Sequence, residues 1–321
     1  MLAASAHIAG GIVVWLWLGW QVHTRWHGWL RRFGVLTMIG VTVSIHWTIW
    51  MDPDWVRALV AIPMFLFLAK TWEIAAQNTS ANAQISSFGQ LAIWALCVPE
   101  GHVAHEAEER RTLGATGWTR IARGAIKVIS LAGLLYLNQI ADLTFIPGLE
   151  VTWMCFVVYI TFSGLWDLIA GTAALMGISI SPMFDAPPIA RNPREFWGRR
   201  WNLWFTKSAH RLIFVPLGGR NRPLLAVSAV FVVSALLHEA IVMLGLKAFD
   251  GRMLVFFSIH GLATIGFTLL KQRWPTPWPR PIAVSLHFLW MVATTPLFMG
   301  PADDMMAISG WTLEMAINLG V

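Results

Sequence analysis

The sequence contains few charged residues. Only 12% of its 321 residues are charged, and 56% are hydrophobic, whereas an ordinary soluble domain has about 25% charged residues. This scarcity argues against a soluble globular protein. The roughly 180 apolar residues are enough for on the order of nine membrane crossings of about 20 residues each. The composition therefore predicts a polytopic membrane protein.

Cysteine and tyrosine are also scarce. The two cysteines, Cys97 and Cys155, both lie in apolar stretches, which argues against a disulfide framework and against a cysteine metal site. Tyrosine occurs twice but tryptophan 20 times. Tryptophan favours the boundary between membrane and water, so the simplest interpretation of this excess is an aromatic girdle at the lipid interface.

Several motifs of soluble enzymes are missing. The sequence has no Gly-x-Ser-x-Gly elbow, no Walker loop and no Gly-x-Gly-x-x-Gly fingerprint, so serine-nucleophile and nucleotide-fold chemistries have no support. The formal net charge is +6. Because the basic residues collect in loops between apolar runs, they indicate the cytoplasmic side of a bilayer and not a nucleic-acid partner.

The apolar runs give a topology. Runs long enough to cross the bilayer are Leu2 to Trp20, Phe33 to Trp50, Trp55 to Trp72, Ile121 to Ala141, Val151 to Met176, Leu224 to Leu246, Met253 to Leu270, Ile282 to Met299 and Met305 to Val321. A shorter run, Ile85 to Val98, is expected to be interfacial or re-entrant. Basic and acidic loops alternate, which places the N-terminus outside and the basic loops in the cytoplasm. We expect one all-α integral-membrane domain over residues 1–321, in a cell inner membrane or an endomembrane.

One polar, basic and aromatic stretch, residues 178–222, interrupts the apolar runs. Its pattern predicts a helix from Pro193 to Val215, with Asn192 as N-cap, that lies in the membrane interface. Asn202, Thr206 and His210 follow i, i+4 and i+8 spacing and form one polar line along it; an ordinary solvated stripe is the alternative. The basic face, with Arg199, Arg200, Lys207 and Arg211, suits either lipid phosphates or the phosphates of a soluble cofactor.

Polar side chains inside spans are costly and are candidates for a site. Asp167 is expected to be a structural carboxylate held by neighbouring donors. His238 has Ser234 one turn away on the same face, while Glu239 lies about 100° round the helix and is poorly placed to orient it. A neutral imidazole in a dry site suits a general base acting on a hydroxyl.

Metal chemistry is the competing use of the histidines. His238-Glu239 begins a zincin box, but Val242 stands where the second histidine is needed. His23 with His27, and His102 with His105, have the spacing of desaturase histidine boxes, yet a double-histidine box is missing. We therefore expect no metal site.

Four blocks, taken together, resemble a known family. They are Ser181-Pro182, Phe196-Trp197-Gly198-Arg199-Arg200-Trp201-Asn202, Pro216-Leu217-Gly218 and Ser234-Ala235-Leu236-Leu237-His238-Glu239. They resemble the wax synthase-like branch of the membrane-bound O-acyltransferases, with Ala235 where that branch commonly has glycine. The core motif region spans residues 181–239.

The resemblance implies a bundle of spanning and interfacial helices around a central tunnel. It implies an acyl-CoA-dependent O-acyltransferase, with His238 as catalytic base and Asn202 beside the thioester. Acyl-CoA enters from the cytoplasm as co-substrate, with no permanently bound cofactor. The acceptor is a lipophilic hydroxyl compound, most simply a long-chain alcohol that gives a wax ester, and membrane lipids surround the protein. Residues expected to bind the substrates or acyl-CoA are Trp197, Arg199, Arg200, Trp201, Thr206, His210, Ser234 and Glu239.

Other functions stay open on the sequence alone. One is a short-chain, acetyl-transferring enzyme acting on another lipid or small product. The others are a histidine-box metalloenzyme and a non-catalytic polytopic protein. The oligomeric state is not indicated by the sequence.

Overall fold

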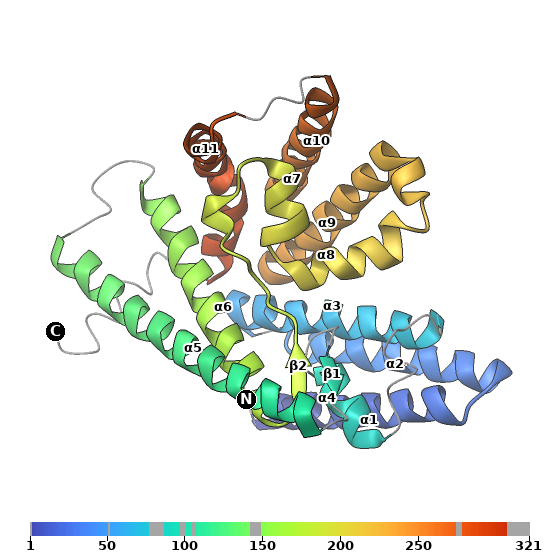
Figure 1. Ribbon diagram of the computed structural model, residues 1–321. Helices are drawn as coiled ribbons and strands as arrows, with labels where there is room; N and C mark the ends of the chain where they lie inside the picture. Colours follow the sequence, from blue (N-terminus) through green and yellow to red (C-terminus); the bar gives the residue numbers. More distant parts are fainter. Residues whose placement is uncertain are drawn as a thin grey trace.

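The computed structural model describes residues 2–50, 52–76, 87–96, 101–103, 107–141, 149–273 and 278–306. These residues are mainly helical (Figure 1). The long helices are α1 (Leu2–Thr24), α2 (Gly28–Thr48), α3 (Asp54–Ala76), α5 (Ala107–Ala141), α6 (Leu149–Leu175), α9 (Pro223–Leu246), α10 (Arg252–Arg273) and α11 (Arg280–Met306). The shorter elements are α4 (Phe88–Leu96), β1 (Gly101–Val103), β2 (Ile178–Ile180), η1 (Pro187–Ile189), α7 (Pro193–Glu195), η2 (Phe196–Arg200), α8 (Leu203–Ala209), η3 (His210–Phe214) and η4 (Gly219–Asn221).

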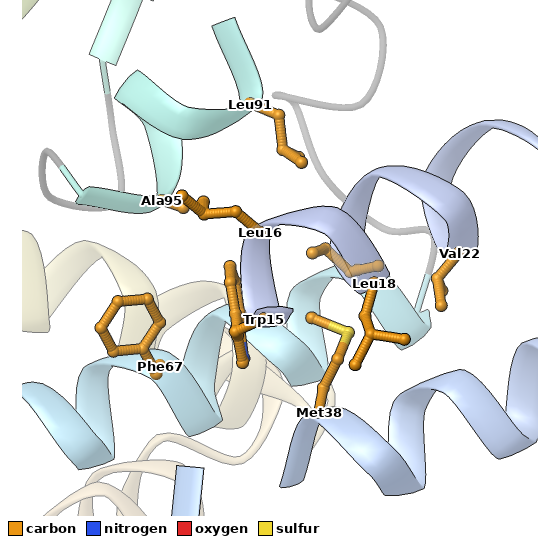
Figure 2. Close-up of a cluster of buried hydrophobic side chains, with 9 residues drawn as sticks. Trp15, Leu16, Leu18, Val22, Met38, Phe67, Leu91 and Ala95 are labelled. Carbon is orange, nitrogen blue, oxygen red and sulfur yellow. The ribbon is translucent and has the colours of Figure 1, made fainter. Parts of the chain in front are cut away.

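The first three helices pack side by side, with α4 across α1 (Figure 1). Their shared core is built around Trp15, which is 1% exposed, and Met38 and Leu91, which are fully buried. Figure 2 shows these side chains meeting between the helices. The Trp15 Nε1 group also donates to Thr71 Oγ1 at 3.0 Å, so the indole is fixed by packing and by one polar contact.

The α5 and α6 helices form the closest helix pair. A Cβ atom added at Gly117 would lie 2.9 Å from the Gly171 carbonyl oxygen, and one at Gly124 would lie 2.9 Å from that of Gly164. Glycines therefore allow the two backbones to approach directly, as in tightly packed membrane helices. The strands β1 and β2 pair antiparallel beside this helix pair.

A cluster of ions around one buried carboxylate lies farther along the same pair. Asp167 of α6 is 5% exposed and accepts from Arg123 at 2.8 Å and from Lys127 at 2.6 Å. Lys127 also donates to Ser163 at 2.6 Å. The prediction that neighbouring donors hold Asp167 is confirmed, because two cations of α5 offset the cost of burying this carboxylate.

Five helical stretches are long and apolar enough to cross a membrane: Val56–Ala75, Thr152–Leu175, Pro223–Leu246, Arg252–Lys271 and Arg280–Met305. They coincide with five of the runs predicted from the sequence. Three more of those runs form α1, α2 and part of α5, which are not among the five, and Met305 to Val321 lies almost wholly outside the described residues. Nine spans therefore stay a prediction. The short α4 helix agrees with the prediction that its run does not cross, because nine residues reach only about 14 Å.

Candidate active site

The motif region is helical but not one helix. Asn192 caps it as predicted, since its Oδ1 accepts from the Glu195 amide at 2.9 Å. The predicted continuous helix from Pro193 to Val215 is wrong, however, because the chain leaves helical geometry at Trp201 (φ −104°, ψ 131°) and Asn202 (φ 44°, ψ 58°). Asparagine tolerates this left-handed conformation better than most residues. Helix α8 then restarts, with Asn202 Oδ1 facing the Phe205 amide at 3.4 Å.

Both halves of the motif region contain a wide π-type turn. The Trp201 amide donates to the Phe196 carbonyl and the Val215 amide to the His210 carbonyl, each at 2.9 Å. These turns, η2 and η3, redirect side chains that an α-helix would spread evenly, and such turns are frequent at functional sites. The result is that aromatic and amide groups of this segment face one cavity.

Glu195 stabilises the start of the motif region through two arginines. It is 9% exposed and accepts from Arg191 and Arg200, each at 2.8 Å. Burial raises the pKa of the Glu195 carboxyl, but the hydrogen bonds from the two arginines outweigh it and lower the pKa to about 2. Arg200 also donates to the Asp185 carbonyl at 2.9 Å, so its guanidinium hydrogen-bonds to groups of the protein itself.

A cavity of about 200 Å³ lies between the motif region, α9 and α10. It brings together seven of the ten predicted site residues: Trp197, Trp201, Asn202, Thr206, His210, Ser234 and His238. Asn202, Thr206 and His210, which were predicted to form one polar line along a single helix, all line this cavity, although Asn202 lies at the break before α8 and His210 follows its end. Thr206 Oγ1 donates to the Trp197 carbonyl at 2.8 Å, which ties α8 to the preceding turn.

His238 has a defined protonation pattern. Its Nδ1 lies 2.8 Å from the Ser234 backbone carbonyl, and a carbonyl only accepts, so Nδ1 carries the proton. The Nε2 atom is then the lone-pair nitrogen. The ring packs on Phe257 and Phe298, with centroid distances of 4.5 and 5.9 Å. Ser234 lies one turn from His238 as predicted, but the group that contacts His238 is its backbone carbonyl, and the binding of substrate by Ser234 stays a prediction.

The other three predicted site residues lie elsewhere. Arg199 is exposed, and neither it nor Arg200 lines the cavity. Glu239 is 3% exposed, and its Oε1 accepts from the amides of Asp250 and Gly251 at 2.8 and 2.7 Å. Glu239 therefore holds the loop between α9 and α10 and is not among the residues that line the cavity. The prediction that it binds substrate or acyl-CoA finds no support in this geometry, whereas its angular offset from His238 agrees with it.

Some cavity residues were not predicted. Arg194 is exposed and lines the cavity; its position three residues before Trp197 could have signalled it, because such residues share a helix face. Thr264, Phe257 and Phe298 come from α10 and α11, and nothing in their local sequence marks them.

Trp197 is held by a buried polar chain. Its Nε1 donates to His260 Nδ1 at 3.2 Å, and His260 Nε2 lies 2.9 Å from Thr294 Oγ1. Because the indole N–H can only donate, His260 must carry its proton on Nε2. His260 is fully buried, so this histidine fixes one wall of the cavity and does not react.

A metal centre needs several ligand side chains close together. Among the described residues, no three histidine, cysteine, aspartate or glutamate side chains lie close enough to hold an ion. His105 and the side chain of His102, which form one of the histidine pairs, lie outside the described part.

Comparison with known proteins places these features in a family. Residues 180–259 match the model of the "Membrane bound O-acyl transferase family", which contains the region 181–239 identified from its motifs. The chain is 31% identical over 148 residues to Acyl-CoA–sterol O-acyltransferase 1 of Arabidopsis thaliana, covering 42% of this chain and 43% of the relative. It is 28% identical over 187 residues to the Probable long-chain-alcohol O-fatty-acyltransferase 7 of that plant, covering 53% of each.

A third relative is a long-chain-alcohol acyltransferase of another plant. The Long-chain-alcohol O-fatty-acyltransferase of Simmondsia chinensis is 25% identical over 210 residues, covering 53% of this chain and 57% of the relative. The chain thus spans about half the length of the curated relatives it matches. The predicted resemblance to the wax synthase-like branch is confirmed.

Proposed function

We propose that this chain, whose segment 180–259 matches the model of the membrane-bound O-acyltransferase family, transfers an acyl group from acyl-CoA to the hydroxyl of a long-chain alcohol. The observation that carries the proposal is the cavity that both His238 and Asn202 line, with His238 Nδ1 bonded to a carbonyl and Nε2 left as the lone-pair nitrogen. A lone-pair imidazole nitrogen and an amide are the two groups that ester formation from a thioester needs, one to take a proton and one to bind an oxyanion.

The proposed reaction needs no covalent enzyme intermediate. His238 Nε2 takes the hydroxyl proton of the alcohol while its oxygen attacks the thioester carbonyl, and the C–O bond forms. The Asn202 amide donates to the resulting oxyanion. When the C–S bond breaks, the CoA sulfur leaves and receives the proton from the His238 imidazolium. The ester and free CoA are the products, and His238 returns to its starting state.

We expect the donor to bind where basic side chains line the cavity. Arg194 and His210 are exposed and line it, and a guanidinium suits the phosphates of CoA. Arg199 is also exposed and suits either CoA or lipid phosphates. These residues belong to the basic stretch that the charge pattern predicts on the cytoplasmic side, where acyl-CoA is available.

The rest of the lining supports a dry reaction. Phe205, Phe214, Phe257 and Phe298 surround the polar groups. Apolar walls limit hydrolysis of the thioester by water, which is the main side reaction of such a site.

A sterol is the second candidate acceptor. The sterol acyltransferase relative shares 31% identity with this chain, and a sterol presents one hydroxyl on an apolar body just as a fatty alcohol does. The two acceptors use the same catalytic groups and differ in the shape of the apolar part.

A substrate screen tests the proposal. Purified protein in detergent or vesicles is incubated with acyl-CoA donors from acetyl to stearoyl and with hexadecanol, cholesterol or diacylglycerol, and the products are identified by mass. We expect hexadecyl esters of long-chain acids to form fastest. Faster ester formation with cholesterol would favour the second candidate, and absence of ester with every pair would contradict both.

A further inference from the structure

A polar pocket lies between α5 and α6, apart from the candidate active site. Its volume is about 250 Å³, and its walls come from α5, α6 and the loop 182–186 that follows β2. Neither Asn202 nor His238 lines this α5–α6 pocket. The proposed acyl transfer therefore gives it no role, and its chemistry has to be read from its own residues.

The cations at this pocket exceed what its buried carboxylate needs. Asp167 carries one negative charge, yet it accepts hydrogen bonds from both Arg123 and Lys127. One turn earlier on α5, Arg120 lies close enough to interact electrostatically with Asp167 and Arg123. Its guanidinium donates to the neutral Ile180 carbonyl at 2.6 Å. Three cations thus surround one buried carboxylate.

A second carboxylate of the lining does not cancel this excess. The Asp185 side chain is 68% exposed, and its ion pair is with Arg200 at 3.9 Å. Arg200 does not line the α5–α6 pocket. Water and salt screen an exposed carboxylate strongly, so Asp185 contributes little to the charge balance around Arg123 and Lys127.

The two cations of the lining also keep N–H groups for a ligand. Arg123 bonds Asp167 through Nε and Nη2, and its Nη1 has no acceptor among the described residues. The Arg123 side chain is 53% exposed, so this nitrogen is accessible. Lys127 Nζ bonds Asp167 and Ser163 and keeps the third of its three hydrogens. A guanidinium and an ammonium side by side suit a phosphate group.

The surroundings of the pocket indicate where such a phosphate comes from. Helix α5 lies at the edge of the described structure (Figure 1), and α6 is long and apolar enough to cross a membrane. Large apolar side chains near the pocket on these two helices are exposed: Trp118, Ile126, Ile129, Leu165 and Ile169. The charged pocket therefore interrupts a surface that suits lipid chains.

The depth of the pocket agrees with a lipid headgroup. Asp167 lies about two turns before the end of α6, and the loop 182–186 beyond that end closes the pocket. The charge pattern predicts this end on the cytoplasmic side. Basic pockets between membrane helices on that side are suited to anionic headgroups.

We propose that the α5–α6 pocket binds the phosphate of an anionic membrane lipid, with Arg123 and Lys127 as the phosphate-binding residues. The lipid chains then lie along the exposed apolar face of α5 and α6. Phosphatidylglycerol should bind better than phosphatidylcholine, because the excess positive charge repels the choline cation. This proposal goes beyond acyl transfer, so its test measures binding and not turnover.

Photolabelling in vesicles tests the site. The full-length protein is placed in phosphatidylcholine vesicles with a phosphatidylglycerol that has a diazirine next to its glycerol backbone. We expect labelled peptides that contain residues 118–129 or 159–169. Unlabelled phosphatidylglycerol should compete, and added phosphatidylcholine should not. Labelling confined to other peptides, or equal competition by the two lipids, would overturn the proposal without any variant.

A pair of arginine variants tests the phosphate-binding residue. Arg123→Gln removes the charge but keeps a donor for Asp167, and it should raise the phosphatidylglycerol concentration for half-maximal labelling about tenfold. Arg111→Gln is the matched control, because Arg111 is an exposed arginine of the same helix that does not line the pocket. It should label as wild type does. Unchanged labelling in folded Arg123→Gln would overturn the proposal.

A soluble competitor separates a lipid from a free phosphate compound. Glycerol 3-phosphate has the phosphate but no chains, and we expect it to compete only weakly with the photolabel. Competition as strong as that of phosphatidylglycerol would overturn the lipid assignment. Ester formation by wild-type protein that does not label at these peptides would overturn this proposal and leave the proposed function intact.

Discussion

Two cavities border the motif region. They share Trp197, Trp201 and Phe298 in their linings but differ in the number of polar side chains that line them. The smaller one gathers Asn202, Thr206, His210, Ser234 and His238 around one space. The larger one, of about 420 Å³ between α6 and α11, has mainly aromatic and aliphatic walls. This difference leads us to expect that the polar cavity performs the transfer and that the apolar one holds an apolar chain. Four substitutions test this expectation.

His238→Ala should have the largest effect. Removing the lone-pair nitrogen that takes the hydroxyl proton should lower kcat about a thousandfold. The protein should still fold, because the ring packs on Phe257 and Phe298, which line the cavity, and bonds one backbone carbonyl. Initial rates of ester formation check this, with His46→Ala as the control for loss of a buried histidine. A rate within threefold of wild type would show that the smaller cavity does not perform the chemistry.

Asn202→Asp tests the amide while sparing the fold. Aspartate can still cap α8 and tolerates the left-handed conformation, but it replaces the amide N–H by a carboxylate that repels an oxyanion. We expect kcat to fall about a hundredfold, with an unchanged melting temperature. Unchanged kinetics would mean that Asn202 only terminates one helix and starts the next.

Trp197→Ala tests the wall between the cavities. Removing the indole should join the two spaces and change the ratio of kcat/KM between long and short acyl donors about tenfold. Trp197→Phe is the matched variant, because it also removes the hydrogen bond to His260 but keeps a ring in the wall. Equal donor preference in the two variants would show that the hydrogen bond, and not the wall, determines any change.

Glu195→Gln should affect the reaction least. Its carboxylate lies outside both cavities, so kcat should stay within about twofold of wild type. The carboxylate pairs with Arg191 and Arg200, so the free energy of unfolding should fall by about 1 kcal/mol.

The pH dependence of stability tests the interaction of Glu195 with Arg191 and Arg200. The pKa of Glu195 is about 2 in the folded protein, below its ordinary value of 4.5, so its contribution is complete above pH 4.5 and is lost as the pH falls toward 2. The melting temperature of the wild-type protein should fall as the pH is lowered through this window. The same slope in Glu195→Gln would contradict the assignment.

Local patterns were enough to predict much of the site. Asn202, Thr206 and His210 all line the smaller cavity, although the single helix assumed for their spacing is broken at Asn202. The i, i+4 spacing of Ser234 and His238 predicted that they lie one turn apart on one face. The angular offset of Glu239 predicted that it does not orient His238, but its predicted role in binding has no support, since it does not line the cavity. In each case helix geometry within a few residues decides the outcome, so the sequence contains the information.

Longer-range features could not be predicted in this way. The break at Trp201 and Asn202 depends on two wide turns whose hydrogen bonds do not follow α-helical spacing. The pairing of Arg200 with Glu195, and of Trp197 with His260, joins residues from different turns or helices. The larger cavity depends on how α6 packs against α11. The sequence periodicity within either helix does not determine how the two helices pack.

Counting both products of one reaction tests whether the polar cavity joins an acyl group to a hydroxyl. Purified protein is given hexadecanoyl-CoA and hexadecanol, and the ester formed and the CoA thiol released are counted in the same sample. We expect one hexadecyl ester for each CoA released, and CoA release that depends on the alcohol. Release of CoA at the same rate without alcohol, with free acid in place of ester, would contradict the proposed function.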